Sequence, residues 1–209
     1  MINIDDCWMT HDRDENGRLY PDPERFPHGI KWLADYAHSK GVKLGIYNDY
    51  GTKTCGGYTG SEGHLIEDAK TFAEWEVDYL KMDGCYSQIL DQNDGYPAMA
   101  RFLNETGRKI VYSCSWPAYD MEMDYAPLPP NCNLWRNWDD IECNWKSIKS
   151  IMDKFGNETK WAEYAGPGHW NDADMVVAGL KGGSLTEDES KSHFAVWSIL
   201  ASPLIMSND

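Results

Sequence analysis

The sequence has 209 residues, and its 34 Asp and Glu outnumber 19 Lys and Arg, which gives a formal net charge of −15. Hydrophobic residues make up 42% and aromatic residues 13%, a composition that suits a packed globular domain and excludes wholesale disorder. The acidic balance argues against nucleic acid or an anionic membrane as a partner, because both attract basic surfaces. No apolar run approaches the roughly 20 residues that a membrane-spanning helix needs.

Short β-rich segments alternate with amphipathic segments along the whole chain. We predict strands near residues 1–6, 43–48, 78–83, 109–115, 133–138, 162–166 and 203–207. Apolar residues at helical spacing predict helices around residues 30–37, 65–73 and 145–155. Thr186 and Glu189 form a capping-box pattern before a helix over 193–201, and Pro203 ends that helix.

The alternation predicts repeated βαβ units and therefore a parallel sheet, either open or closed into a barrel. No glycine-rich G-x-G-x-x-G loop follows the first strand, which disfavours a dinucleotide-binding fold. Polar side chains follow one predicted strand after another, at Asp5, Asp6, Asp49, Asp83, Ser115, Asp139, Asp140, Asn171 and Asp172. Functional groups of a (β/α)8 barrel lie at the carboxyl ends of its strands, so we predict a barrel forming one domain over residues 1–209.

The segment Tyr79–Cys85 carries the clearest chemical signal. Alternate side chains of a strand share a face, so Lys81 and Asp83 point the same way while Met82 points into packing. A nearby cation favours the ionised acid, and an ionised acid at the end of a strand suits a nucleophile. The alternative is a buried structural Lys/Asp pair.

A second carboxylate follows the predicted strand that contains Arg136. Asp140 comes directly after Asp139, and like charges disfavour double ionisation, so one acid of this pair could hold a proton. Asp83 and Asp140 can face each other across a barrel mouth, which would supply the two carboxyl groups of glycoside hydrolysis. Arg136 could bind sugar hydroxyls or developing charge. Alternatively, Asp139 and Asp140 cap the helix predicted over 144–155.

Aromatic and metal-ligating residues leave further alternatives open. Four tryptophans follow strand ends and could stack on a sugar ring, although core packing is the commoner role for each: Trp8, Trp116, Trp138 and Trp170. His169, Asp172 and Asp174 suggest a Mg²⁺ site only weakly, because they lack fixed ligand spacing.

Six cysteines occur at positions 7, 55, 85, 114, 132 and 143, and the sequence alone does not pair them. None forms a C-x-x-C motif, which disfavours a zinc or thioredoxin-type site. N-glycosylation sequons begin at Asn104 and Asn157. Cysteines together with sequons favour the secretory route.

Long motifs spread over the chain resemble glycoside hydrolase family 27, the lysosomal α-galactosidases and α-N-acetylgalactosaminidases. They are INIDDCW (2–8), RFPHGI (25–30), GVKLGIYNDYG (41–51), YLKMDGC (79–85), SCSWPAY (113–119), NLWRNWDDI (133–141), GPGHWNDADM (166–175) and ASPLIMSND (201–209). The resemblance implies a retaining exo-glycosidase on a (β/α)8 barrel, lysosomal or secreted and often dimeric, with no metal or organic cofactor.

By this resemblance, Asp83 falls on the family's nucleophile and Asp140 on its acid/base. Further positions grip the terminal sugar: Asp5, Asp6, Tyr47, Lys81, Ser115, Ala118, Tyr119, Arg136 and Asp174. The resemblance also implies disulfides Cys55–Cys85 and Cys114–Cys132, and a glycosylation site at Asn104.

Substrate preference is expected to depend on the loop after the strand predicted at 109–115. α-Galactosidases have a glutamate and a leucine where this sequence has Ser115 and Ala118. Small side chains leave room for a 2-acetamido group, so the chain resembles the α-N-acetylgalactosaminidase branch, as does His169. Small pockets discriminate weakly against a smaller substrate, so α-galactoside hydrolysis should persist.

The sequence also departs from the family pattern. The family's first strand and its C-terminal β domain are expected to be missing, which leaves approximately strands 2 to 8. Cys7 and Cys143 have no partner that can be assigned. A non-catalytic sugar-binding fragment is therefore the alternative to an enzyme.

Overall fold

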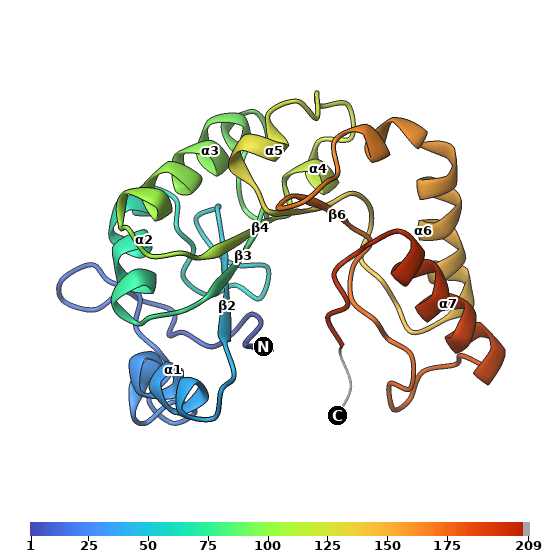
Figure 1. The fold of residues 1–209 in the computed structure, drawn as a ribbon. Coiled ribbons are helices and arrows are strands. Elements are labelled where there is room, and N and C mark those ends of the chain that lie inside the picture. Colours follow the sequence, from blue (N-terminus) through green and yellow to red (C-terminus); the bar gives the residue numbers. More distant parts are fainter. Residues whose placement is uncertain (207–209) are drawn as a thin grey trace. The chain divides into compact units, whose positions relative to one another are not determined.

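The computed structural model describes residues 1–206, in which helices and strands alternate along the chain (Figure 1). The chain divides into two compact units, Met1–Tyr119 and Asp120–Asp209, and the second unit is described as far as residue 206. Among the described residues, no helix is both long enough and apolar enough to span a membrane.

The first unit is built on parallel strands that pair in chain order. These are β1 (Ile2–Asn3), β2 (Leu44–Asp49), β3 (Tyr79–Asp83) and β4 (Val111–Cys114). The helices are α1 (Gly29–Ser39), α2 (Leu65–Glu74), α3 (Ile89–Glu105) and the short α4 (Trp116–Tyr119). Parallel pairing brings the carboxyl ends of the strands to one edge of the sheet, where ligands of such sheets bind.

Buried residues hold this unit together in the pattern that the sequence predicts. Every residue of β2 is buried, and α1 buries Ile30, Ala34 and Ala37 on one face. Helices α2 and α3 pack against each other on the same side of the strands (Figure 1). Burial of these apolar faces is the main force that fixes the strands, and with them the polar residues at the strand ends.

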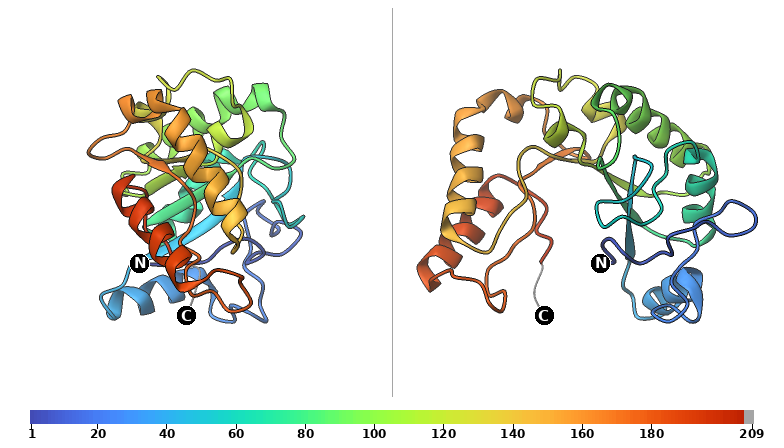
Figure 2. Two further views of the ribbon diagram at one scale, coloured as in Figure 1. Left: turned by 90° about the vertical axis from the view of Figure 1, so that its right-hand side faces the viewer. Right: turned by 180° about the vertical axis from the view of Figure 1, so that it is seen from behind.

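The second unit contains α5 (Leu128–Asn131), β5 (Leu134–Arg136), α6 (Trp145–Asn157), the 3₁₀ helix η1 (Thr159–Glu163), β6 (Trp170–Asp172) and α7 (Glu187–Ile199). Strands β5 and β6 are parallel, and α6 and α7 lie side by side (Figure 2). Their apolar core comprises Ile148, Ile151, Ala173, Val176, Val177 and Trp197. The predicted capping box at the start of α7 is present, with Thr186 and Glu189 bonded reciprocally.

Two predicted strands are wrong. The segment 162–166 belongs to η1 and the turn after it, because Trp161 is buried against Phe155 and a turn joins Gly166 to His169. The strand of this region is β6, several residues later. Within the described part of segment 203–207, only an isolated bridge joins Met206 to Val176. A short apolar run does not by itself distinguish a strand from a helical turn.

Candidate active site

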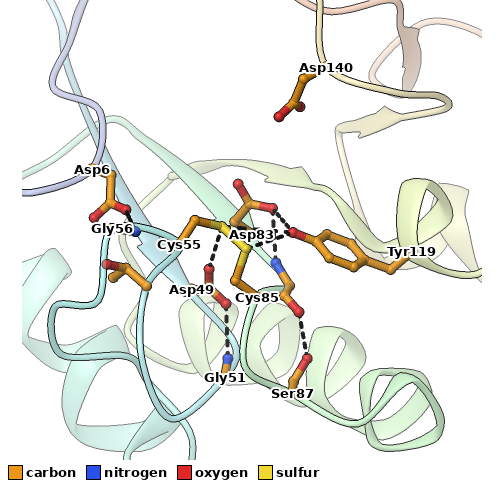
Figure 3. The surroundings of a disulfide bond; sticks show 12 residues. Asp6, Asp49, Gly51, Cys55, Gly56, Asp83, Cys85, Ser87, Tyr119 and Asp140 are labelled. Carbon is orange, nitrogen blue, oxygen red and sulfur yellow. Dashed lines mark hydrogen bonds between the residues drawn. A yellow bond between two sulfur atoms is a disulfide. The ribbon is translucent and has the colours of Figure 1, made fainter.

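The carboxylate of Asp83, at the end of β3, is held by three donors. The Tyr119 hydroxyl donates to Oδ1 at 2.8 Å (Figure 3). The Gly84 N–H donates to Oδ1 at 3.0 Å, and the Tyr47 hydroxyl donates to Oδ2 at 3.0 Å. Burial, followed by the charge of Asp83, raises the pKa of both phenols far above the usual value. The two tyrosines are therefore protonated donors at any physiological pH, and they fix the plane of the carboxylate.

Strand β3 has the side-chain alternation that the sequence predicts. Met82 is completely buried, whereas Lys81 and Asp83 on the other face are only partly buried. The Lys81 ammonium pairs with Asp5 at 3.4 Å and lies 5.1 Å from the ring centroid of Tyr47. The ion pair with Lys81 therefore places the segment after β1 beside the end of β3. Asp6 in the same segment accepts a hydrogen bond from the Gly56 N–H at 2.7 Å.

A disulfide lies directly beside this cluster. Cys55 and Cys85 are bonded to each other, as predicted, and link the loop after β2 to the loop after β3 (Figure 3). Cys114 and Cys132 are each disulfide-bonded as well. Among the described residues, Cys7 and Cys143 are free thiols.

Asp49 belongs to this cluster, although sequence reasoning did not select it as a site residue. It lies in register with Asp83 on the neighbouring strand and has no exposed surface. Burial first, then the charge of Asp83, raises its pKa to about 8. A signal was present, because Asp49 is one of the polar residues that follow predicted strands.

The loop after β4 delivers Tyr119 to Asp83 through the single turn of α4. Ser115 is buried and its N–H donates to the Met82 carbonyl, while Ala118 is partly exposed on α4. Trp116 is a core residue that stacks on Tyr96. Trp8 is also a core residue, and its indole N–H donates a hydrogen bond to the Tyr47 carbonyl. Core packing, the favoured role, therefore holds for both of these tryptophans, whereas Trp138 and Trp170 are partly exposed.

In the second unit, Arg136 ends β5 and organises two carboxylates. Its Nη2 lies 2.9 Å from Oδ1 of Asp140 and 3.1 Å from Oδ2 of Asp174. The Asp140 side chain is 94% exposed, whereas that of Asp174 is 7% exposed and also accepts from the N–H groups of Ile141 and Met175. Asp140 is thus the accessible acid, and Asp174 anchors Arg136 and the segment that follows Asp140.

The alternative role of Asp139 and Asp140 as helix caps is wrong. The N-cap of α6 is Asn144, whose side chain accepts from the Ser147 N–H at 2.9 Å. Asp139 and Asp140 precede the cap and are exposed. Their position leaves Asp140 available for chemistry. That Asp83 and Asp140 serve one reaction stays a prediction.

The residues suggested for Mg²⁺ do not come together. In the described chain, donor atoms of at least three metal-ligating residues converge at two places, Asp49 with Cys55 and Cys85, and Asp35 with His38 and Glu76. The first group contains the disulfide. In the second, Lys31 pairs with both acids. His169, Asp172 and Asp174 form no such group.

Both sequon asparagines lie on the surface. Asn104 is exposed in the last turn of α3, and Asn157 is exposed at the last position of α6. Their exposure is what attachment of a glycan requires. Glycosylation at either asparagine stays a prediction.

Comparison with known proteins adds independent information. A family model described as "Alpha galactosidase A" matches residues 1–209. The chain is 56% identical to the α-N-acetylgalactosaminidase of Gallus gallus, covering 100% of this chain and 52% of the relative, and 53% identical to human α-galactosidase A, covering 99% and 49%. It therefore spans about half the length of the curated relatives that it matches.

Among solved structures, α-galactosidase I from Mortierella vinacea superposes with a TM-score of 0.89 at 35% identity, covering 99% of this chain and 57% of that one. The structural neighbours are (β/α)8 barrels, so the predicted fold class is confirmed, with this chain covering part of such a barrel.

Proposed function

Because this chain belongs to the alpha galactosidase A family, glycoside hydrolase family 27, we propose that it carries the catalytic residues of a retaining exo-α-glycosidase. Its substrates would be terminal α-linked N-acetylgalactosamine and, less readily, galactose on glycolipids or other glycoconjugates. One observation carries the proposal. A carboxylate at the carboxyl end of a parallel strand, Asp83, is oriented by two phenols and a backbone N–H.

Retention requires a nucleophile and an acid/base, which we assign to Asp83 and Asp140. Asp83 attacks the anomeric carbon while Asp140 gives its proton to the leaving oxygen, and a glycosyl ester forms. Asp140 then takes a proton from water as that water displaces Asp83, which restores both groups. Its exposure suits Asp140 for exchanging protons with substrate and water, and its contact with the Arg136 guanidinium holds the side chain in place.

The preference for N-acetylgalactosamine is argued from the small residues Ser115 and Ala118. The test is the double variant Ser115→Glu and Ala118→Leu, assayed with aryl α-N-acetylgalactosaminide and aryl α-galactoside. We expect kcat/KM for the first substrate to fall by about 10- to 100-fold, because the larger side chains occupy the place of the acetamido group. The kcat/KM for the aryl α-galactoside should stay the same or rise. An unchanged ratio of the two substrates would contradict the assignment.

Two other functions are separated by the same assay. α-Galactosidase as the main activity is favoured by the 53% identity to human α-galactosidase A, and it predicts a higher kcat/KM for the galactoside in the unmodified protein. Sugar binding without turnover is suggested by a chain that spans about half of its relatives. It predicts that both aryl substrates bind and neither is cleaved.

We propose a lysosomal or secreted location and a homodimer for the protein that contains this chain. The exposed sequon asparagines support entry into the secretory pathway. Expressed in a secretory host, the protein should carry N-glycans, and Asn104→Gln and Asn157→Gln should each remove one mass increment. An unmodified mass for the secreted protein would contradict the glycosylation, and a monomer in light scattering would contradict the dimer.

A further inference from the structure

We propose that Asp49 is a positioning residue that acts as a neutral carboxylic acid. It donates its proton to the Tyr47 oxygen, so that Tyr47 gives its own proton to Asp83. The inference rests on the proposed function, because it concerns the group that orients the nucleophile. It assigns a separate role to a residue that does not itself touch the sugar.

Tyr47 lies between two carboxyl groups but has a single hydroxyl proton. The Tyr47 hydroxyl lies 3.0 Å from Oδ2 of Asp83 and 3.4 Å from Oδ2 of Asp49. A phenol has one proton, so it donates to only one of the two carboxyl groups. If both acids were ionised, Oδ2 of Asp49 would face the lone pairs of the Tyr47 oxygen rather than its proton. A proton on one of the two acids removes that conflict, because the protonated acid can donate to the Tyr47 oxygen.

The surroundings decide which acid carries that proton. Asp83 is partly exposed and accepts hydrogen bonds from Tyr119, Gly84 and Tyr47. Three donors and solvent therefore stabilise its ionised form. Asp49 is completely buried; the Gly51 N–H donates to its Oδ1 at 3.1 Å, the Cys85 N–H also donates to the carboxyl group, and no cation pairs with it among the described residues. Burying a carboxylate is costly unless charges or several donors compensate, so the neutral form belongs on Asp49.

The groups packed around Asp49 are consistent with this assignment. Tyr47 is on its own strand, Asp83 is opposite it on β3, and the Cys55–Cys85 disulfide covers Oδ2, with the Cys55 sulfur 3.4 Å away (Figure 3). Lys81 lies on β3 in register with Tyr47, and its ammonium pairs with Asp5. The raised pKa of Asp49, due first to burial and then to Asp83, agrees with a protonated acid.

A neutral Asp49 leaves a single negative charge on the neighbouring pair Asp49 and Asp83. Ionisation of Asp49 would place a second anion beside Asp83 and would make Asp49 compete with Asp83 for the single proton of Tyr47. Two interacting carboxyl groups that share a donor titrate at separate pH values. Asp49 can therefore remain neutral beside the nucleophile up to pH values near its raised pKa of about 8.

The decisive experiment observes the protonated carboxyl group directly. Infrared difference spectra of the chain, recorded during titration from pH 5 to pH 9, should show a protonated-carboxyl band that is lost near the pKa of Asp49, about 8. The band should be absent in Asp49→Asn. It should persist in Asp83→Asn with a lower midpoint, because the neighbouring charge has been removed. A spectrum without this band at neutral pH in the unmodified chain overturns the inference.

Kinetics give a second, independent readout. Asp49→Asn keeps the size and a donor, so kcat should change by less than about threefold, whereas Asp49→Leu should lose at least about tenfold. In a double-mutant cycle, Tyr47→Phe should abolish most of the difference between Asn and Leu at position 49. Equal losses for Asn and Leu, or full additivity with Tyr47→Phe, would overturn the role. If the chain shows the band but cleaves no glycoside, the proposed function fails while the protonation of Asp49 stands.

Discussion

Three hydrogen-bond donors orient the half-buried carboxylate of Asp83. Tyr47 approaches it from the neighbouring strand and Tyr119 from α4, so its orientation depends on two separate elements. Hydrogen bonds to a charged acceptor contribute more than neutral ones, typically about 1.5 to 3 kcal/mol. Their loss should therefore be visible in catalysis before it is visible in folding.

We predict that Tyr119→Phe lowers kcat/KM by about 10- to 100-fold, because Asp83 loses a donor at 2.8 Å while the ring keeps its packing. The measurement is steady-state hydrolysis of the better aryl glycoside, with circular dichroism as a check on folding. Tyr112→Phe is the matched control, since it removes a buried hydroxyl whose acceptor is the Tyr96 carbonyl. Equal activity in both variants would show that Tyr119 does not orient the nucleophile.

At the scale of elements, regular periodicity made β3 and α1 predictable, whereas α3 was missed. Gly95 and Pro97 lie inside α3, and both residues disfavour helix interiors. Tertiary packing overrides that propensity, because Gly95 lets the helix approach the ring of Tyr50. Asp49 was missed as a site residue for a related reason. Its importance comes from its register with Asp83, a contact between positions 34 residues apart that local patterns do not encode.

The chemistry of the site was more predictable than its boundaries. The alternation Lys81, Met82, Asp83 follows from the period of a strand. The family resemblance predicts Tyr47 and Tyr119 as substrate-binding positions, and that role stays a prediction. The sequence did not show that both phenols donate to Asp83, because that contact depends on how β2 and α4 are placed. The sequence also left the N-cap of α6 ambiguous, and the cap is Asn144 rather than either aspartate of the pair.

Two helical glycines give a matched test of this packing argument. A Cβ at Gly95 would lie 2.1 Å from an atom of the Tyr50 ring, whereas one at Gly156 in α6 would meet no atom within 4 Å. Gly95→Ala should therefore destabilise the chain by roughly 1 to 3 kcal/mol despite its better helix propensity. Gly156→Ala should stabilise it by roughly 0.5 to 1 kcal/mol. Urea unfolding measures both, and stabilisation by Gly95→Ala would contradict the close approach.

For the whole chain, two buried titratable groups, Asp49 and His193, make the free energy of unfolding change with pH in opposite directions. Asp49 has a raised pKa, so the unfolded chain loses its proton at lower pH than the folded chain does. This group's stabilisation is complete below about pH 4 and falls as pH rises towards 8. His193 acts in the opposite direction. Burial lowers its pKa to about 4, so the unfolded chain binds a proton that the folded chain refuses.

The His193 contribution can be isolated because its environment is well defined. Nε2 accepts from the Val177 N–H at 3.1 Å, so Nδ1 carries the proton, and that buried atom has no hydrogen-bond partner among the described residues. Protonation would add a second hydrogen and a charge that no residue in the described part of the chain compensates. As pH falls from 6.5 to 4, we therefore expect His193 to cost stability on the order of 3 kcal/mol.

Urea unfolding of the unmodified chain and of His193→Gln, at intervals from pH 4 to pH 8, tests this expectation. The glutamine carbonyl can still accept from Val177 but does not titrate, so the stability difference between the two proteins should change in favour of the variant below pH 6.5. Any packing loss against Trp197 is the same at every pH and leaves that slope intact. Repulsion among the surface acids, which underlies the net charge of −15, is also common to both proteins and cancels in the difference. A difference that stays constant from pH 7 to pH 4 would mean that His193 is protonated as readily in the folded chain as in the unfolded one.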